Sequence, residues 1–322
     1  MSPLTVTMLG GFTLTYEGKK VDLLANRRTF PIALQFLLLT WLRGEEGLTE
    51  DEAVLYFVAS RQSADVGSAL NYLTTVARRI LKDSGLPPMR YVLRKGGAFY
   101  PDPNVLIDLD VNAFRDCVEQ ARGAADKADG RYIATRRHTA PAEMAGPPVS
   151  GRESGERFVM TTPPDSAGWE PARELACRKA IDTYRGRLLP ELQEEEWVQL
   201  EGRTLADMYR EVVDLLAQLT RDRGDAAGES ALYERAAFVQ PEQHWEARQL
   251  EALLMQGRDR EAAQLYERTI TRFLQGMKNV RTGRILAGAA AANGQILAFA
   301  KQTDEIFQRV LAAREHQGRS DA

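Results

Sequence analysis

Residues 65–100 read DVGSALNYLTTVARRILKDSGLPPMRYVLRKGGAFY, and this stretch decides how the N-terminal third of the chain folds. Its first half predicts a helix over 65–83, because apolar residues recur there at three- and four-residue steps. Gly and Pro residues at 84–88 end this helix. Two short strands, 90–94 and 98–100, follow around the tip Lys95-Gly96-Gly97, which predicts a β-hairpin. The residues expected to turn toward the core are Val66, Ala69, Leu70, Leu73, Ala77, Ile80 and Leu81.

The residues before this stretch predict strands and two further helices. Between residues 4 and 24 apolar residues alternate with others, and Glu17-Gly18-Lys19-Lys20 predicts a tight turn between two strands. From Arg27 to Arg43 the apolar period is helical. Another helix begins after Thr49, which can cap it while Glu52 reaches back, the pattern of a capping box. The predicted order is a strand hairpin, three helices and a glycine-tipped hairpin.

From Leu109 onward the chain is predicted to be helical, apart from residues 130–168, which are rich in Pro, Gly, Ser, Thr and Arg and predict a loop or insertion. One internal repeat follows. The sequence LYER at 232–235 recurs at 265–268, and Gly224 recurs as Gly257, both at an offset of 33 residues. That period is close to the roughly 34 residues of tetratricopeptide (TPR) repeats. It predicts helix pairs that stack into a curved scaffold with a concave face.

Composition is that of a soluble protein, with 44% hydrophobic and 27% charged residues among 322. No stretch approaches the roughly 18 apolar residues of a membrane span, and we expect no secretory signal. Cys117 and Cys177 lack metal-ligand spacing, so we expect free thiols in a reducing cytoplasm. Residues 1–105 carry 12 Lys and Arg against 10 Asp and Glu, whereas the remainder carries 30 against 35. This division gives only weak support to a nucleic-acid partner.

Several segments, taken in order, resemble the antibiotic regulatory proteins (SARP type) of bacteria. In the N-terminal part these are LGGFTLTYEGKKVDL, LTEDEAV and SALNYLTTVARRIL. Further along, IDLDVNAF, AIDTYRGRLLPEL, Glu196-Trp197 and the run from Ala231 to Ile270 resemble the bacterial transcriptional activator domain that accompanies them. The resemblance spans roughly residues 5–273. It rests on the ordered set, since no single motif is diagnostic.

The resemblance implies an α+β N-terminal winged helix-turn-helix domain at residues 1–108 and an all-α, TPR-like helical-repeat domain at 109–276, with the insertion at about 130–168. A helical tail, 277–322, completes the expected organisation. The helix at 65–83 would enter the DNA major groove, and the hairpin around Lys95 would be the wing near the DNA backbone.

The DNA-binding residues that this arrangement implies lie on the solvent face of that helix and on the wing. Asn can read adenine edges, Arg can read guanine edges, and hydroxyl groups bond phosphates or bases. The alternative is a solvated helix face without a ligand. The predicted contacts are Ser68, Asn71, Tyr72, Thr75, Arg78, Arg79, Lys82, Arg94 and Lys95.

Two features depart from the family pattern. Val76 stands where a charged, DNA-facing Arg is expected, within TVAR where relatives carry Ser-Arg-Leu-Arg or His-Arg-Leu-Arg. The insertion at 130–168 and the alanine-rich tail are also unlike the usual pattern.

No catalytic or cofactor site is predicted. Gly10-Gly11 lies between strand residues and is interpreted as a bulge, since no Lys-Ser/Thr follows it as in a phosphate-binding loop. The three histidines are scattered and suggest no metal. Glu194-Glu195-Glu196 is interpreted as the charged start of a helix. Trp169, Trp197 and Trp245 are interpreted as packing residues between repeat helices.

These observations predict a cytoplasmic, non-enzymatic transcription regulator that binds double-stranded DNA without a cofactor. Its helical repeats would contact RNA polymerase or another regulator. A homodimer is a further alternative that the sequence does not decide. The alternative is an interaction protein whose winged helix has lost specific DNA binding. The near-neutral N-terminal part and Val76 favour this alternative, whereas Arg78-Arg79 and the intact wing favour DNA.

Replacing residues 130–168 by a short Gly/Ser linker is expected to leave the melting transition nearly in place. The segment lacks an apolar stripe, and loop-closure entropy grows slowly with length. Thermal melting of both chains measures this, and a large drop in melting temperature would mean that the segment packs into the core.

Overall fold

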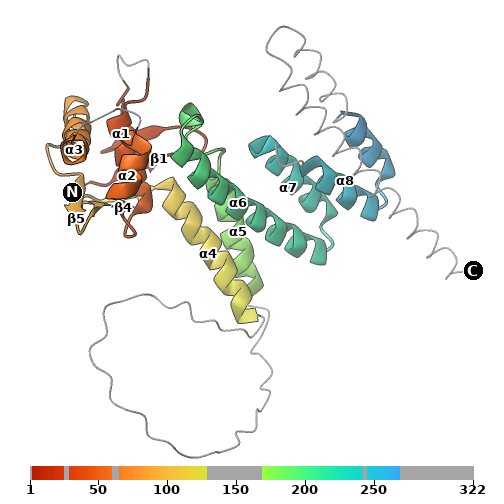
Figure 1. Ribbon diagram of the computed structural model, residues 1–322. Helices are drawn as coiled ribbons and strands as arrows, with labels where there is room; N and C mark the ends of the chain where they lie inside the picture. Colours follow the sequence, from red (N-terminus) through yellow and green to blue (C-terminus); the bar gives the residue numbers. More distant parts are fainter. Residues whose placement is uncertain (1, 25–28, 60–64, 129–168, 242–244, 269–322) are drawn as a thin grey trace, which may run out of the picture.

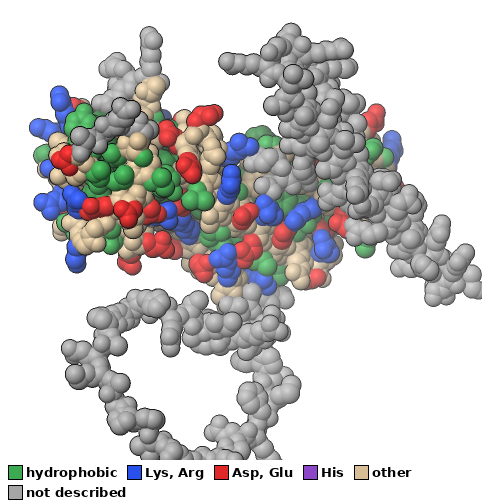
Figure 2. All heavy atoms as spheres, viewed as in Figure 1, with side chains coloured by type: hydrophobic (Ala, Val, Ile, Leu, Met, Phe, Trp, Pro, Cys, Tyr) green, Lys and Arg blue, Asp and Glu red, His purple; other side chains and the backbone are tan. Residues whose placement is uncertain are grey.

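The computed structural model describes residues 2–24, 29–59, 65–128, 169–241 and 245–268 (Figure 1). A region of strands and three helices lies at one end, and helices follow from residue 110 onward. Acidic and basic side chains are interspersed over both regions on the face shown in Figure 2. No helix within the described ranges is long and apolar enough to span a membrane. The predicted insertion at 130–168 and the predicted tail at 277–322 lie outside the described residues.

Two small sheets frame the N-terminal region. The first has the order β3-β2-β1-β7, with β1 and β7 parallel and the other pairs antiparallel. The second is antiparallel with the order β4-β6-β5. The strands are β1 (Leu4–Thr7), β2 (Thr13–Tyr16), β3 (Lys19–Val21), β4 (Leu48–Thr49), β5 (Val92–Lys95), β6 (Ala98–Pro101) and β7 (Ile107–Leu109).

Both predicted hairpins form, but their turns are shorter than predicted. Glu17-Gly18 and Gly96-Gly97 each lie at positive φ, as two-residue type I′ turns require. Lys19, Lys20 and Lys95 were expected in the turns and instead belong to the strands. The tight two-residue turn matches the twist of the strands, which allows the pairing to extend up to the glycines.

Three helices pack against one another, and the first two also contact the second sheet: α1 (Ile32–Arg43), α2 (Glu50–Phe57) and α3 (Val66–Asp83). Helix α1 is buried from Ala33 to Leu42 and forms the centre of the core. It begins at Ile32 rather than Arg27, because Pro31 is its N-cap and a proline disfavours helical conformation in the residue before it. Helix α2 has the predicted capping box, in which the Thr49 hydroxyl accepts from the Glu52 amide and Glu52 accepts from the Thr49 amide.

The segment after β1 joins the N-terminal region to the helical one. The Asp110 carboxylate accepts from the backbone N–H groups of Met8, at 2.9 and 3.0 Å, and Leu9, at 2.9 Å. On the other side, the amide of Leu189 donates to the Met8 carbonyl at 2.8 Å and that of Gly10 to the Arg187 carbonyl at 2.9 Å.

Gly10 is therefore no simple bulge. It lies at φ +85°, and a Cβ there would stand 3.0 Å from the carbonyl oxygen of Arg185. Only glycine tolerates both this φ and this close approach of two backbones. The hydrophobic core accordingly runs without a break from Leu4 to residues of α6, α7 and α8. The domain boundary predicted at residue 108 stays a prediction. The regions on its two sides share one hydrophobic core.

The helical region consists of α4 (Asp110–Ala128), α5 (Trp169–Thr183), α6 (Glu196–Asp222), α7 (Ala226–Val239), α8 (Trp245–Met255) and a helical segment at 259–268, with a short 3₁₀ turn at Pro190–Leu192. Each helix up to α8 packs against the next in the chain (Figure 1). Glu195 is the N-cap of α6, so the acidic run does start a helix. Both cysteines are free, as predicted, and Cys177 is buried.

The 33-residue repeat corresponds to a repeated turn. After α6, Gly224 donates to the Arg221 carbonyl and Asp225 to the Thr220 carbonyl; after α8, Gly257 and Arg258 donate in the same way to Leu254 and Leu253. Both glycines lie in the left-handed region, at φ 73° and 71°. These are two Schellman caps, each of which ends one helix and is followed by the next helical segment. The matching glycines therefore have one conformational cause.

The two repeated tyrosines differ in burial. Tyr233 is 4% exposed and stacks on Trp245 with ring centroids 6.3 Å apart. A structural repeat predicts that both tyrosines are largely buried, but Tyr266 is only half-buried, because it packs against a small second cluster at the end of the described helices. Trp245 packs between helices as predicted.

Trp197 has a different place from the one predicted. It is buried at the junction of the two regions, where its ring packs against Phe57 of α2 and its Nε1–H donates to the Gln35 amide oxygen at 3.3 Å. Gln35, buried within α1, donates in turn to Glu195 at 3.1 Å. The Trp169 side chain lies outside the described residues.

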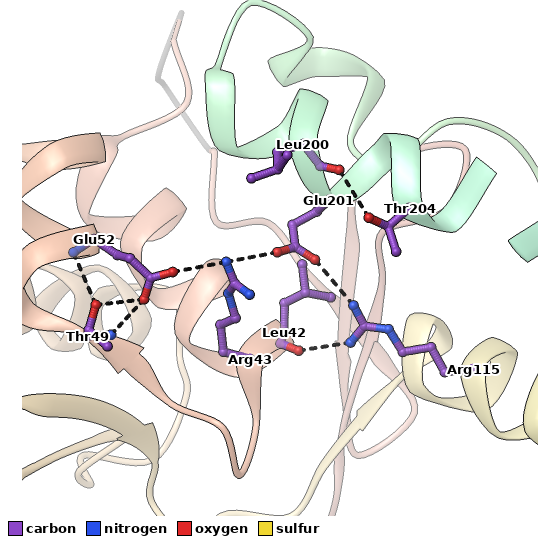
Figure 3. A network of polar contacts seen from close by, with 8 residues as sticks. All are labelled: Leu42, Arg43, Thr49, Glu52, Arg115, Leu200, Glu201 and Thr204. Atoms are coloured by element: carbon purple, nitrogen blue, oxygen red, sulfur yellow. Dashed lines mark hydrogen bonds and ion pairs between the residues drawn. The ribbon is translucent and has the colours of Figure 1, made fainter. Parts of the chain in front are cut away.

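A network of ion pairs lies at the same junction (Figure 3). Glu201 of α6, whose side chain is 9% exposed, accepts from Arg43 at 3.1 Å and from Arg115 of α4 at 3.3 Å. Arg43 also pairs with Glu52, the capping residue of α2, at 3.2 Å. Arg115 donates to the carbonyl of Leu42 at the end of α1. Helices α1 and α4 thus meet at this carboxylate of α6, and Arg43 links it to Glu52 of α2.

Tyr233→Ala is expected to destabilise the full chain by roughly 3–5 kcal/mol, the usual range for a large buried aromatic side chain. Tyr266→Ala is the matched control and is expected to cost clearly less, because its ring is half-exposed. Chemical denaturation of both variants measures the difference. Equal losses in the free energy of unfolding would show that the burial of the tyrosine ring does not determine its contribution to stability.

Glu201→Gln keeps the side-chain shape but leaves two arginines without their shared carboxylate. We expect a loss of about 1.5–3 kcal/mol in the free energy of unfolding, the range for hydrogen bonds to charged groups. Glu211→Gln removes a second α6 carboxylate, paired with Arg122, but there both side chains are about 40% exposed. That control is expected to cost about 1 kcal/mol or less. Equal losses in the two variants would show that burial of the Glu201 ion pairs does not increase their contribution to the free energy of unfolding.

Candidate nucleic-acid interface

Helix α3 has a buried stripe and an open face. Leu70, Leu73, Ala77, Ile80 and Leu81 are buried against α1 and α2. The seven side chains predicted on the opposite face are all exposed, namely Ser68, Asn71, Tyr72, Thr75, Arg78, Arg79 and Lys82. The apolar spacing thus positions a polar and basic face toward solvent, as the amphipathic pattern predicts.

The start of this face is committed to capping. Asp65 is the N-cap of α3 and accepts from the Gly67 amide at 3.0 Å and from the Ser68 hydroxyl. These hydrogen bonds lower the pKa of Asp65. One turn on, the Thr75 hydroxyl donates to the Asn71 carbonyl at 2.8 Å, so its proton is engaged within the helix.

The basic side chains of the face differ in their pairing. Arg79 lies 3.6 Å from Asp83, but both side chains are largely exposed and such a pair is weak. Arg78 and Lys82 form no ion pair with any residue that the structure describes. Tyr72 is 65% exposed and offers an aromatic surface beside them.

Val76 does not lie on the open face. It is half-buried and packs against the hydrophobic core, next to the buried stripe of the helix. The charged residue that the family pattern places here is therefore replaced by a packing residue.

The hairpin β5–β6, which the sequence predicts to be the wing, contacts α3 through a hydrogen bond of Arg94. Lys95 is exposed at the end of β5. Arg94, one residue earlier, turns toward α2, where Glu50 accepts from its Nε and Nη2 at 2.7 Å each. Its Nη1 donates to Asn71 Oδ1 at 3.3 Å. The hydrogen bonding between Arg94 and Glu50 lowers the pKa of Glu50 and raises that of Arg94.

The predicted residues are thus brought together on one surface. Lys and Arg side chains lie along the outer edge of the N-terminal region in Figure 2, where Figure 1 has α3 and β5, with acidic side chains next to them. Sequence reasoning missed Glu50, which pairs with Arg94 across 44 positions of sequence. Its place in the first turn of α2 indicated a favourable helix dipole, and nothing local indicated the arginine.

No group of metal-binding side chains occurs among the described residues. A hollow of about 450 Å³, whose lining includes Trp41, Tyr100 and Asn112, contains none of the predicted DNA-binding residues in its lining.

Comparison with known proteins gives two findings. Residues 165–276 match the family model of the bacterial transcriptional activator domain. The fold is similar to that of Mycobacterium tuberculosis EmbR, solved in complex with a low-affinity phosphopeptide, with a TM-score of 0.52 at 14% identity over 98% of this chain and 72% of that one. No curated protein matches the chain significantly. The chain therefore carries a bacterial transcriptional activator domain within an EmbR-like fold, which confirms the predicted resemblance to SARP-type transcription regulators.

Proposed function

We propose that the chain regulates transcription by binding double-stranded promoter DNA through a winged helix-turn-helix, with α3 in the major groove and the β5–β6 hairpin beside the backbone. The observation that carries the proposal is the open face of α3, where Asn71, Arg78 and Lys82 stand clear of the core. A helix of this width fits the major groove, and amide and guanidinium groups read base edges there. This role requires neither catalysis nor a cofactor.

The helical region is proposed to contact RNA polymerase or another regulator in the cytoplasm. Its match to the transcriptional activator domain family supports this. The described helices after Gly224, which are α7, α8 and the segment 259–268, would present an extended surface of the kind that repeat proteins use for binding.

One observation favours a second function, that of an interaction module without specific DNA binding. The positive charge near the face is partly compensated, since Arg94 pairs with Glu50 and Arg79 lies near Asp83. Less positive charge then remains for the non-specific attraction to phosphates on which DNA binding normally relies.

The full chain is expected to bind DNA fragments from its own locus, with an affinity that falls as salt rises because each phosphate contact releases counterions. Arg78→Ala should weaken this binding. Arg260→Ala removes an equally exposed charge from the far helical segment and should leave binding unchanged. Titrations at two salt concentrations measure all three chains.

The full chain is used because residues 1–108 alone would lack Asp110 and Leu189, which hold the segment after β1. An intact protein that fails to bind DNA at low salt would favour the interaction module. Equal affinities for the two arginine variants would remove α3 from the interface.

A further inference from the structure

Arg94 is held on three sides. Glu50 binds it through two parallel hydrogen bonds of 2.7 Å, the geometry in which a guanidinium and a carboxylate match. Its third nitrogen, Nη1, donates to Asn71 Oδ1 at 3.3 Å. The guanidinium also lies over the Phe99 ring, 5.6 Å from its centroid. Every nitrogen of Arg94 is thus engaged within the protein, and its charge faces a carboxylate.

The contact with Arg94 determines what Asn71 can offer to DNA. A guanidinium donates hydrogen bonds and accepts none, so the amide of Asn71 must turn its oxygen toward Arg94. Its Nδ2 group, with two donor hydrogens, then remains for other partners, and the side chain is exposed. A free asparagine reads adenine with both atoms, accepting from N6 and donating to N7. Oδ1 keeps a second lone pair, but its direction is set by Arg94, so a paired reading of adenine would require the amide to turn away from the guanidinium.

We propose that Arg94 is a positioning residue: held by Glu50, it fixes the amide of Asn71 so that only the Nδ2 donor faces the DNA. The base edge that Asn71 recognises is then an acceptor, such as N7 of either purine, O6 of guanine or O4 of thymine, instead of the donor–acceptor pair of adenine. This inference rests on the proposed DNA-binding function and replaces the predicted contact of Arg94 with DNA.

The neighbouring side chain makes a matched comparison. Lys95 has the same charge and lies on the same strand, but it is exposed and forms no ion pair with a described residue. A lysine in this situation suits a phosphate contact, which adds affinity without sequence information. Arg94 and Lys95 should therefore differ in kind, although both substitutions remove one positive charge.

The test selects preferred sites from a randomised DNA library with the full wild-type chain and with Arg94→Met and Lys95→Met. For Arg94→Met we expect a new preference for adenine at the base pair that Asn71 contacts, with the ratio of affinities there changing by roughly 5- to 150-fold. Lys95→Met should weaken binding to all sequences alike. Asn71→Ala should show no preference at that base pair in either background.

A second probe replaces the contacted purine by its 7-deaza analogue, which lacks the N7 acceptor. At a selected site where Asn71 contacts a purine N7, the wild-type chain should lose affinity for this DNA, whereas Asn71→Ala should not. If Arg94→Met does not fold, as judged by its melting transition, Glu50→Gln takes its place, because it weakens the hold on Arg94 and should shift the preference in the same direction.

Three results would overturn the inference. Equal losses on all sequences for Arg94→Met and Lys95→Met would make Arg94 a phosphate contact. Unchanged preference in Asn71→Ala would mean that Asn71 reads no base. A wild-type chain that binds no DNA at low salt would overturn the proposed function together with this inference, whereas the first two results leave that function standing.

Discussion

The carboxylate of Glu201 is the point on which the arrangement of the two regions depends. A nearly buried carboxylate is costly unless it is paired and hydrogen-bonded. Arg43 from the end of α1 and Arg115 from α4 supply both, and they can do so only when α6 lies against them (Figure 3). Arg43 in turn reaches the capping carboxylate of α2, Glu52. The start of the helix that precedes α3 is therefore tied to the activator-domain side of the chain.

Backbone contacts reinforce this junction. The segment after β1 is held between Asp110 and the strand-like stretch around Leu189, with Gly10 at the closest approach. Trp197 fills the space beside it with its one polar atom satisfied by Gln35. A displacement of α6 relative to α1 would break the ion pair between Arg43 and Glu201. It would also separate Trp197 from Phe57 and Gln35. The position of one region is therefore coupled to that of the other through several contacts.

How far the sequence predicts this molecule depends on the range of each interaction. The capping box at Thr49, the buried stripe of α3 and the two glycine caps 33 residues apart are local, and each follows from residue type and spacing. The predicted start of α1 at Arg27 is wrong, because the apolar period continues before Pro31 whereas a proline disfavours helical conformation in the residue before it. The contacts that define the surface and the junction, Arg94 with Glu50 and Arg43 with Glu201, join residues far apart, and no local pattern indicates them.

The compensation of charge around α3 links the two halves of the proposed function. Of the basic side chains near the face, Arg94 and Arg79 have acidic neighbours, which leaves chiefly Arg78, Lys82 and Lys95 to attract phosphates. Each phosphate contact contributes to salt-dependent affinity, so few contacts mean weak binding to DNA at large. A regulator of this kind gains its affinity at a promoter from base contacts and from a second attachment that raises the local concentration of the first. Under the proposed function, the helical region, which is joined to the N-terminal region through the ion pairs of Glu201, would provide that attachment.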